Sequence, residues 1–310
     1  MTMEGPELGE ADFAAVFDTL RRWPDGAVAD ERGTLADVTP EMVQAALRVP
    51  RLGRQVSLAL PIDRTAGPDN ARPALHHMVD LGDVEEPEPS AHKDFIGLDY
   101  HGKAVTHLDA ICHIGYRGEL YGGVAAAAAF SSRGSAWATV QGLAPGIVLR
   151  GVLLDIPRVR GVEWLEPGTA VHATDLLGAE EALGFEISPG DAVLLRSGHQ
   201  ARRRQLGAWD SGEASAGLHI DVMPLLAERG VVLLGGDGDS DARPSPVKGV
   251  HSPIHALALT ALGMPLLDNL DLEALSRECA QAGRYEFLLT VAPLVVPGGT
   301  GSPVNPIAVL

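Results

Sequence analysis

Residues 101–113 read His-Gly-Lys-Ala-Val-Thr-His-Leu-Asp-Ala-Ile-Cys-His, and this stretch holds three imidazoles and one carboxylate. Neutral imidazole and carboxylate are side chains that bind Zn²⁺, Mn²⁺ and Fe²⁺. Side chains alternate between the two faces of a strand, so a strand places His107 and Asp109 on the same face. A helix would separate these two residues by about 200°. The spacing therefore predicts a strand through His107 and Asp109 that carries metal ligands.

The other two histidines require the chain to bend on either side of that strand. An extended chain rises about 3.3 Å per residue, which would leave His113 roughly 20 Å from His107. We therefore expect a turn after Asp109, leading into a helical segment that brings His113 close enough to act on a metal-bound water. His101 has the same distance problem, and Gly102 can supply its bend. The alternative is that these residues are grouped by chance.

Composition limits the class of protein. The chain has 310 residues, is 45% hydrophobic and has a mean hydropathy of +0.08, which suits one large domain with a substantial core. Its net charge of −17 argues against nucleic acid or an anionic membrane surface as a partner. Its two cysteines, Cys112 and Cys279, form no disulfide framework and indicate a reducing compartment. With no apolar leader and no apolar run of bilayer length, we expect a cytoplasmic protein.

Helical and strand patterns alternate along the chain, which predicts an α/β fold. The expected strands are 55–60, 147–156, 191–196, 231–234 and 286–296. The expected helices are 11–23, 40–48, 221–228, 253–262 and one that opens within 172–175 and runs to about 183. Thr39 before Pro40 and Ser252 before Pro253 are typical helix starts, and Thr174 is the expected N-cap of the helix that ends near 183. The polar segment 63–93, with His76, His77 and His92, is interpreted as a mobile loop that lines the mouth of the pocket.

The histidine-rich stretch resembles a known family. The signature His-x-Gly-Thr-His-x-Asp-x-x-x-His is typical of the metal-dependent cyclase family, which includes bacterial kynurenine formamidase and isatin hydrolase. Four residues match it in register: Thr106, His107, Asp109 and His113. Lys103 stands at the position of the first histidine, Val105 replaces the glycine, and His101 lies two residues early. We interpret this as a two-residue insertion in which His101 still binds metal; the alternative is that this ligand is lost.

The resemblance implies roles for residues along most of the chain. His107 and Asp109 would bind metal together with His101. His113 would be the general base or proton shuttle, and Thr106 would orient a ligand or the water. His255 and Asp268 match positions that help to hold a second metal in formamidase-like members, with Asp in place of Glu. The implied cofactor is one or two ions of Zn²⁺ or Mn²⁺.

Three further residues are candidates for substrate contact. Tyr116 and Tyr121 follow the metal motif directly, although a surface loop is an equally good interpretation of this segment. His199 follows the expected strand 191–196, and ligands of α/β folds collect at the carboxyl ends of strands. The run 235–241, Gly-Gly-Asp-Gly-Asp-Ser-Asp, has the features of neither a phosphate loop nor a calcium loop. It resembles the Gly-x-Asp-x-x-Ser loop of the family, which is mainly architectural.

The implied function is that of a metal-dependent hydrolase acting on C–N bonds other than peptide bonds. A metal-activated water would attack the carbonyl of a small-molecule substrate, namely an amide, a lactam or a cyclic acyl compound, since bound Zn²⁺ lowers the pKa of water to about 7. Two alternatives stay open: a biosynthetic cyclase or dehydratase, and a non-catalytic binding protein with a degraded metal site. No Gly-x-Ser-x-Gly motif is present, which argues against a serine hydrolase.

The resemblance also refines the expected architecture. It implies a swivelling β/β/α domain of the cyclase and kynurenine formamidase type over residues 51–310. Residues 1–50 would form a helical N-terminal extension, and the protein would assemble as a homodimer or homotetramer.

Overall fold

A nine-stranded mixed sheet forms the centre of the computed structural model, which describes residues 8–23, 29–82 and 89–310. Its strands, in spatial order, are β1 (Gln55–Ser57), β17 (Ile307–Val309), β15 (Glu286–Val291), β9 (Ile147–Asp155), β11 (Ala192–Arg196), β13 (Leu233–Gly236), β14 (Leu266–Asp268), β4 (His107–Asp109) and β16 (Gly301–Pro303). The four strands from β9 to β14 run parallel, and both flanks are antiparallel. The predicted α/β class is confirmed.

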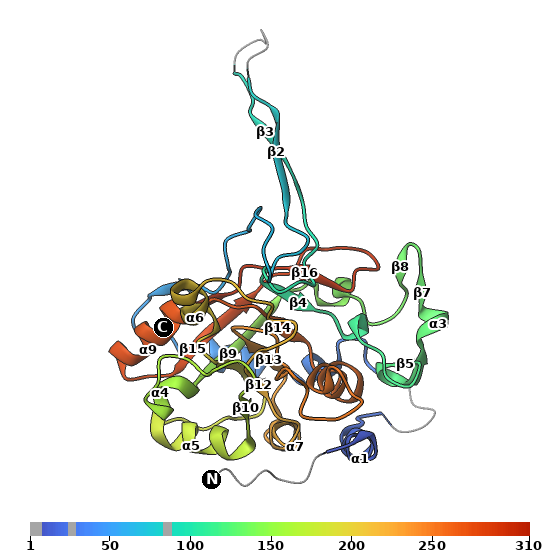
Figure 1. Cartoon of the computed structure of the whole chain (residues 1–310), viewed down its shortest axis with the longest axis vertical. Coiled ribbons are helices and arrows are strands. Elements are labelled where there is room, and N and C mark those ends of the chain that lie inside the picture. Colours follow the sequence, from blue (N-terminus) through green and yellow to red (C-terminus); the bar gives the residue numbers. More distant parts are fainter. Residues whose placement is uncertain (1–7, 24–28, 83–88) are drawn as a thin grey trace.

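The described helices lie around the sheet, with α3 (Ala126–Ala129) well to one side of it (Figure 1). They are α1 (Glu10–Leu20), α2 (Pro40–Ala46), α3 (Ala126–Ala129), α4 (Ile156–Arg160), α5 (Ala173–Leu183), α6 (His199–Leu206), α7 (Val222–Glu228), α8 (Pro253–His255), which continues into the π-helix η5 (Ala256–Leu262), and α9 (Glu273–Ala282). Four 3₁₀ turns are η1 (Gly33–Asp37), η2 (Ile111–His113), η3 (Tyr121–Gly123) and η4 (Val140–Leu143). Within the described ranges, no helix combines the length and apolarity needed to cross a bilayer.

The core lies between the sheet and these helices. Strand β11 is buried along its whole length, as expected for a central parallel strand covered on both faces. The π-helix η5 is also buried at every position. Helix α1 packs against η5 through Phe13 and Phe17, so the N-terminal helices are part of the same packed body. The division at residue 50 stays a prediction.

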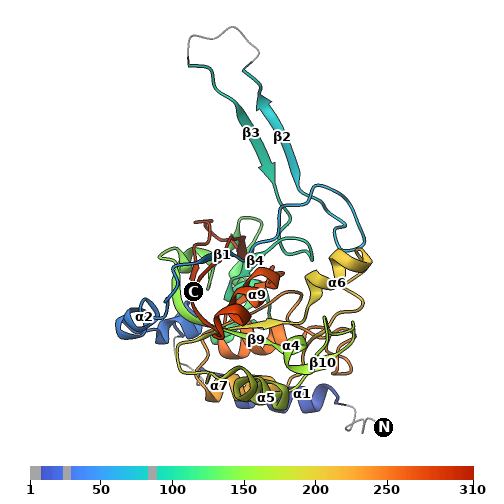
Figure 2. The ribbon, with the colours of Figure 1, turned by 90° about the vertical axis from the view of Figure 1, so that its left-hand side faces the viewer.

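The prediction of a mobile loop over 63–93 is wrong for part of this segment, which contains one strand of a long β-hairpin. Strands β2 (Leu75–Asp80) and β3 (Lys93–Gly97) pair antiparallel and project away from the body as an arm (Figure 1, Figure 2). Four of the six residues of β2 and four of the five residues of β3 are exposed, and neither strand has a buried position. The arm has no apolar face packed on the core, so the alternating pattern that marks a half-buried strand is missing from its sequence.

Small two-stranded ladders complete the fold: β5 (Glu119–Leu120) with β6 (Val124–Ala125), β7 (Phe130–Ser131) with β8 (Gly134–Ser135), and β10 (Ala170–Val171) with β12 (Gly217–Leu218). The expected strand 286–296 ends at Val291, because Pro293 has no N–H to continue the ladder. The tail adds β16 and β17, which the sequence did not predict. The N-cap of α5 is His172 and not Thr174, since Asp175 accepts a hydrogen bond from the His172 backbone at 2.9 Å.

Candidate metal centre

Strand β4 presents His107 and Asp109 on one side, as the two-residue spacing predicts, while Leu108 points into the core. The Nε2 atom of His107 lies 3.4 Å from Oδ1 of Asp109. The Nδ1 atom of His107 lies 2.8 Å from the Val105 carbonyl, which can only accept a hydrogen bond. This contact places the proton on Nδ1 and leaves the lone pair of Nε2 facing Asp109.

Both predicted bends are present. After Ala110 the chain enters η2, and His113 returns so that its Nε2 lies 4.0 Å from Asp109 Oδ1. His101 comes back from the other side, with Nδ1 2.8 Å from the same oxygen. The rings of His101 and His113 stack face to face at 3.9 Å. His101 therefore reaches the site from its shifted position in the sequence.

His255 and Asp268 complete the cluster from the opposite side. In the ladder between β14 and β4, Asp268 lies directly opposite His107. His255, in the first turn after Pro253, has its Nε2 3.2 Å from Asp268 Oδ2 and 3.6 Å from Asp109 Oδ2. All of the predicted metal ligands thus surround one carboxylate, that of Asp109.

The Asp109 carboxylate is the unusual feature of the cluster. Its side chain is 1% exposed, yet neither oxygen has a hydrogen-bond donor among the residues that the structure describes. The same holds for Nδ1 of His101, which approaches the carboxylate at 2.8 Å without hydrogen-bond geometry. Buried polar atoms in native proteins are almost always satisfied. Ligands that share one ion at about 2.1 Å lie roughly 3 Å apart, so these atoms are placed as ligands around a cation.

Two overlapping ligand sets meet the spacing for a divalent ion, and both include Asp109. The first is His101, His107 and Asp109, and the second is Asp109, His255 and Asp268. The electrostatic field at the cluster favours positive charge. Burial alone would raise the pKa of Asp109, but the imidazoles of His107 and His101 outweigh it and hold that pKa well below its usual value. Burial would likewise lower the pKa of His255, but Asp241 and Asp268 raise it well above its usual value.

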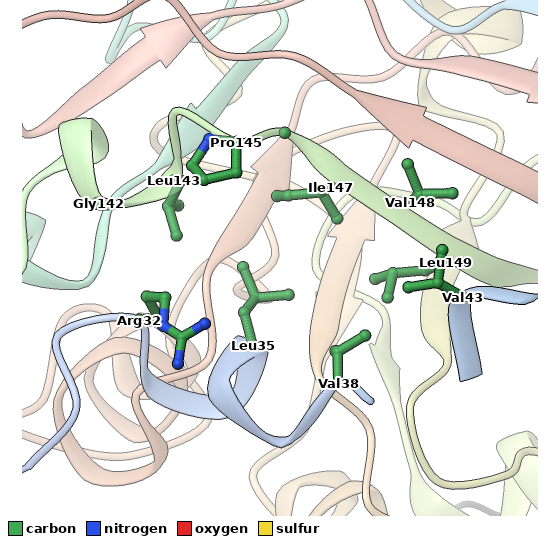
Figure 3. A pocket seen from close by; sticks show the side chains of 11 residues that line it. Arg32, Leu35, Val38, Val43, Gly142, Leu143, Pro145, Ile147, Val148 and Leu149 are labelled. Carbon is green, nitrogen blue, oxygen red and sulfur yellow. The ribbon is translucent and has the colours of Figure 1, made fainter. Parts of the chain in front are cut away.

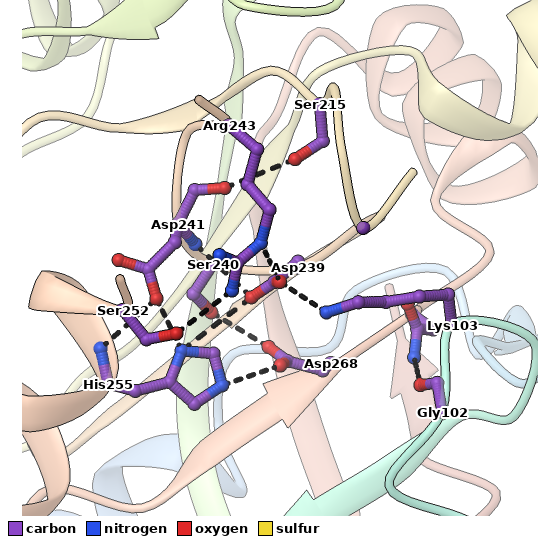
Figure 4. A network of polar contacts seen from close by, with 12 residues as sticks. Gly102, Lys103, Ser215, Asp239, Ser240, Asp241, Arg243, Ser252, His255 and Asp268 are labelled. Atoms are coloured by element: carbon purple, nitrogen blue, oxygen red, sulfur yellow. Dashed lines mark hydrogen bonds and ion pairs between the residues drawn. The ribbon is translucent and has the colours of Figure 1, made fainter. Parts of the chain in front are cut away.

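Asp239 and Asp241 are not among the predicted site residues. Both lie next to the cluster, on the Nδ1 side of His255 (Figure 4). Asp241 Oδ2 lies 2.6 Å from His255 Nδ1, and its Oδ1 accepts the Ile254 N–H at 2.6 Å. Asp239 is held by two cations, Lys103 and Arg243. Burial raises the pKa of Asp239, but His255, Lys103 and Arg243 reverse that effect and keep it ionised.

The sequence did contain a signal for these residues. Asp237, Asp239 and Asp241 follow the carboxyl end of the parallel strand β13, beside the strand that ends at Asp268. Ser240 donates to Asp268 Oδ1 at 2.7 Å, which links the loop directly to a predicted ligand. The architectural interpretation of the run 235–241 was therefore incomplete. Thr300, from the C-terminal tail, was also missed; its hydroxyl lies 2.9 Å from His101 Nε2.

Thr106 does not face the cluster. Its hydroxyl donates to the Asn269 carbonyl at 2.5 Å and accepts the Leu60 N–H at 2.9 Å. Both bonds are to backbone atoms of neighbouring segments. Thr106 thus fastens the start of β4 to its neighbours, and among the described residues its hydroxyl makes no hydrogen bond to a candidate metal ligand.

The three predicted substrate contacts lie elsewhere. Tyr116 packs on the α1 rings of Phe13 and Phe17, with centroids 5.2 and 4.6 Å away. Tyr121 is buried against Trp23, at 5.2 Å. His199 is buried beside Trp209 at 4.5 Å, and burial lowers its pKa to about 4. These contacts are those of packing residues, so the predicted substrate role has no support from their positions.

The stacked pair is the most exposed part of the cluster. The side chains of His101 and His113 are 22% and 24% exposed, whereas those of the other predicted ligands are under 10%. A separate cavity of about 230 Å³ lies between η1, α2 and the start of β9 (Figure 3). Its lining is mainly apolar and includes Leu35, Val38 and Ile147 but no residue of the cluster.

These features define an α/β protein with a buried histidine and aspartate cluster at the carboxyl ends of its parallel strands. The profile of the family described as "Putative cyclase" matches residues 56–240. A crystal structure described as a novel cyclase is 30% identical over 95% of this chain and 99% of that one, with a TM-score of 0.81. The chain therefore belongs to the cyclase family.

Two isatin hydrolases share the fold at lower identity. Isatin hydrolase A from Ralstonia solanacearum is 22% identical, over 82% of this chain and 91% of that one, with a TM-score of 0.60. Isatin hydrolase A from Labrenzia aggregata, bound to benzyl benzoate, is 21% identical over 82% and 93%, with a TM-score of 0.57. A comparison with curated proteins found no match.

Proposed function

We propose that this protein is a metal-dependent hydrolase that cleaves a C–N bond in a small amide, lactam or cyclic acyl substrate. The observation that carries the proposal is the buried Asp109 carboxylate, which has no hydrogen-bond donor among the described residues and is ringed by imidazole nitrogens. The fold shared with two isatin hydrolases supports the choice of reaction.

His101, His107 and Asp109 would hold a divalent cation, Zn²⁺ or Mn²⁺, and His255 and Asp268 would hold a second ion with Asp109 as the shared ligand. A cation in this position supplies Lewis acidity, which polarises a carbonyl and lowers the pKa of water. Asp241 accepts a hydrogen bond from Nδ1 of His255 at 2.6 Å, which would direct Nε2 toward an ion. Thr300 lies 2.9 Å from Nε2 of His101 and would hold that ring with Nδ1 facing Asp109.

His113 is suited to proton transfer by its position. Its Nε2 lies 4.0 Å from Asp109 Oδ1, at the more exposed edge of the cluster, where a substrate would arrive. The stacking on His101 holds the ring in place. Burial lowers the pKa of His113 to about 4, so its imidazole is neutral at pH 7 and carries the nitrogen lone pair that proton transfer needs.

The His113→Ala variant tests this assignment. We expect turnover of N-formyl amides, lactams or cyclic imides to fall by about 10²- to 10⁴-fold, because a positioned acid or base contributes that much. The metal content, measured by mass spectrometry of the purified protein, should equal that of the wild type. His77→Gln, on the exposed arm, is the matched control and should keep wild-type turnover. Unchanged turnover in His113→Ala would remove the residue from the mechanism.

Metal removal tests the proposal as a whole. Dialysis against a chelator should abolish hydrolysis, and stoichiometric Zn²⁺ or Mn²⁺ should restore it, because the proposed reaction depends on a cation that polarises the carbonyl and lowers the pKa of water. Protein that binds no metal at any loading, or that hydrolyses equally well after chelation, contradicts the proposed function.

We also propose that the protein assembles as a homodimer or homotetramer through its arm. Six apolar side chains of the arm are 46–65% exposed: Leu75, Met78, Val79, Leu81, Phe95 and Ile96. A two-stranded hairpin is marginally stable in water when it stands alone, so a second copy that covers it would stabilise it. Each of the six side chains would bury roughly 100 Å² against a second copy. The arms of two copies together would then bury about 1,200 Å² of apolar surface, which reaches the range of stable interfaces.

A further inference from the structure

A second cluster of metal-binding side chains lies outside the candidate metal centre. It consists of His172, His219 and Asp221, whose ligand atoms lie within 4.8 Å of one another. It shares no residue with the cluster around Asp109. Its side chains are more open to solvent, at 46% for His172, 16% for His219 and 43% for Asp221.

The backbone holds the two histidines side by side. Strands β10 and β12 pair in parallel, with Val171 opposite Leu218, so His172 and His219 follow at adjacent carboxyl ends. The His219 N–H donates to the Val171 carbonyl at 2.8 Å, which continues the ladder into this pair. Their rings lie 4.3 Å apart. The two imidazoles are thus placed by strand register, and neither depends on a flexible loop for its position.

Asp221 closes the cluster. Its Oδ2 lies 2.8 Å from His172 Nδ1 and 3.1 Å from His219 Nδ1. Its Oδ1 accepts the Ala173 N–H at 3.1 Å, which fixes the carboxylate against the start of α5. The backbone N–H of Asp221 also lies 3.3 Å from His219 Nδ1, a long hydrogen bond that an ion would replace at this nitrogen's lone pair. Ligand atoms of all three side chains thus lie close enough together to share one ion.

We propose that His172, His219 and Asp221 form a surface site for a transition-metal ion such as Zn²⁺. Two imidazoles and one carboxylate match the donor preference of borderline divalent ions and not that of Mg²⁺ or Ca²⁺, which take oxygen ligands. Three protein ligands leave coordination positions open to water, so the ion exchanges with solvent. The bound ion ties β10 to β12 and fastens the starts of α5 and α7 together.

The experiment measures Zn²⁺ stoichiometry on the full chain, after equilibrium dialysis at micromolar Zn²⁺. The double variant His172→Gln/His219→Gln should hold one equivalent fewer than the wild type, whatever the loading of the Asp109 cluster. His77→Gln, which removes an exposed histidine outside both clusters, should hold the wild-type number. Equal stoichiometry in the double variant and the wild type would overturn the proposal.

A second variant guards against loss of folding. Asp221→Asn keeps an oxygen for the Ala173 N–H and removes only the charge, so it should lose the same equivalent while its far-ultraviolet circular dichroism stays unchanged. Zn²⁺ added after the Asp109 cluster is saturated should raise the Tm of the wild type but not that of Asp221→Asn. An equal rise in both proteins would count against the site. Because the readouts are metal content and Tm, failure here leaves the proposed hydrolase unaffected.

Discussion

At the scale of single residues, Asp109 organises the candidate metal centre. Four imidazoles, from His101, His107, His113 and His255, approach its two oxygens at 2.8–4.0 Å. A buried carboxylate without hydrogen bonds is costly, so the arrangement is stable when a cation compensates it. The ligands themselves are oriented by neighbouring residues: Asp241, the Val105 carbonyl and Thr300 lie 2.6, 2.8 and 2.9 Å from imidazole nitrogens of the cluster.

Asp241→Asn tests that orienting role. The variant keeps the size of the side chain but weakens its acceptance of the His255 Nδ1 proton, so we expect divalent-metal affinity to fall about 10- to 100-fold. Titration calorimetry on protein stripped of metal measures the change. Asp94→Asn, on the exposed arm, is the control and should bind as the wild type does. Full affinity in Asp241→Asn would show that His255 needs no such partner.

At the scale of elements, close packing between strands constrains glycines that have no catalytic role. Gly151 in β9 lies opposite Phe287 in β15, and a Cβ placed there would come within 2.3 Å of the Phe287 ring. Gly178 in α5 has no neighbour within 4 Å of the same position. The two glycines therefore differ in what an added methyl group would meet.

Alanine substitutions at these two sites should change stability in opposite directions. Gly151→Ala should lower the free energy of unfolding by about 1–3 kcal/mol, because the Phe287 ring must move. Gly178→Ala should raise it by about 0.5–1 kcal/mol, because glycine is unfavourable inside a helix. Urea denaturation of both variants measures the difference. A neutral result at Gly151 would mean that β15 shifts without cost.

At the scale of the whole molecule, the arm is the part of the described chain that the body does not cover. Charged residues placed on it should disrupt assembly without disturbing the fold. The double variant Val79→Lys/Ile96→Lys tests this. Both side chains are about half exposed in the single chain, so lysine fits at either position without entering the core. We expect light scattering to give a multiple of 32.5 kDa for the wild type and 32.5 kDa for this variant. Leu177→Lys, on α5, should keep the wild-type mass, and a monomeric wild type would contradict the assembly.

Local features of this protein could be predicted from its amino-acid sequence. The two-residue spacing of His107 and Asp109 encodes a strand, and the distance to His113 requires the turn seen at η2. Capping residues such as Thr39 and apolar runs such as 147–155 likewise act over a few residues. These patterns of spacing, capping and hydrophobicity can be recognised in the sequence because each reflects interactions between residues that are close together in the chain.

Contacts between residues far apart in the chain could not be predicted, because they depend on how the strands are ordered in the sheet. Asp241 contacts His255 and Thr300 contacts His101 because the order of strands brings them together, and the contact between Thr300 and His101 spans 199 positions. Tyr116 follows the metal motif in sequence yet packs on α1, since sheet order and core packing outweigh nearness in the chain. The arm also escaped prediction, because its strands pair with each other and bury no face that would leave a hydrophobic pattern.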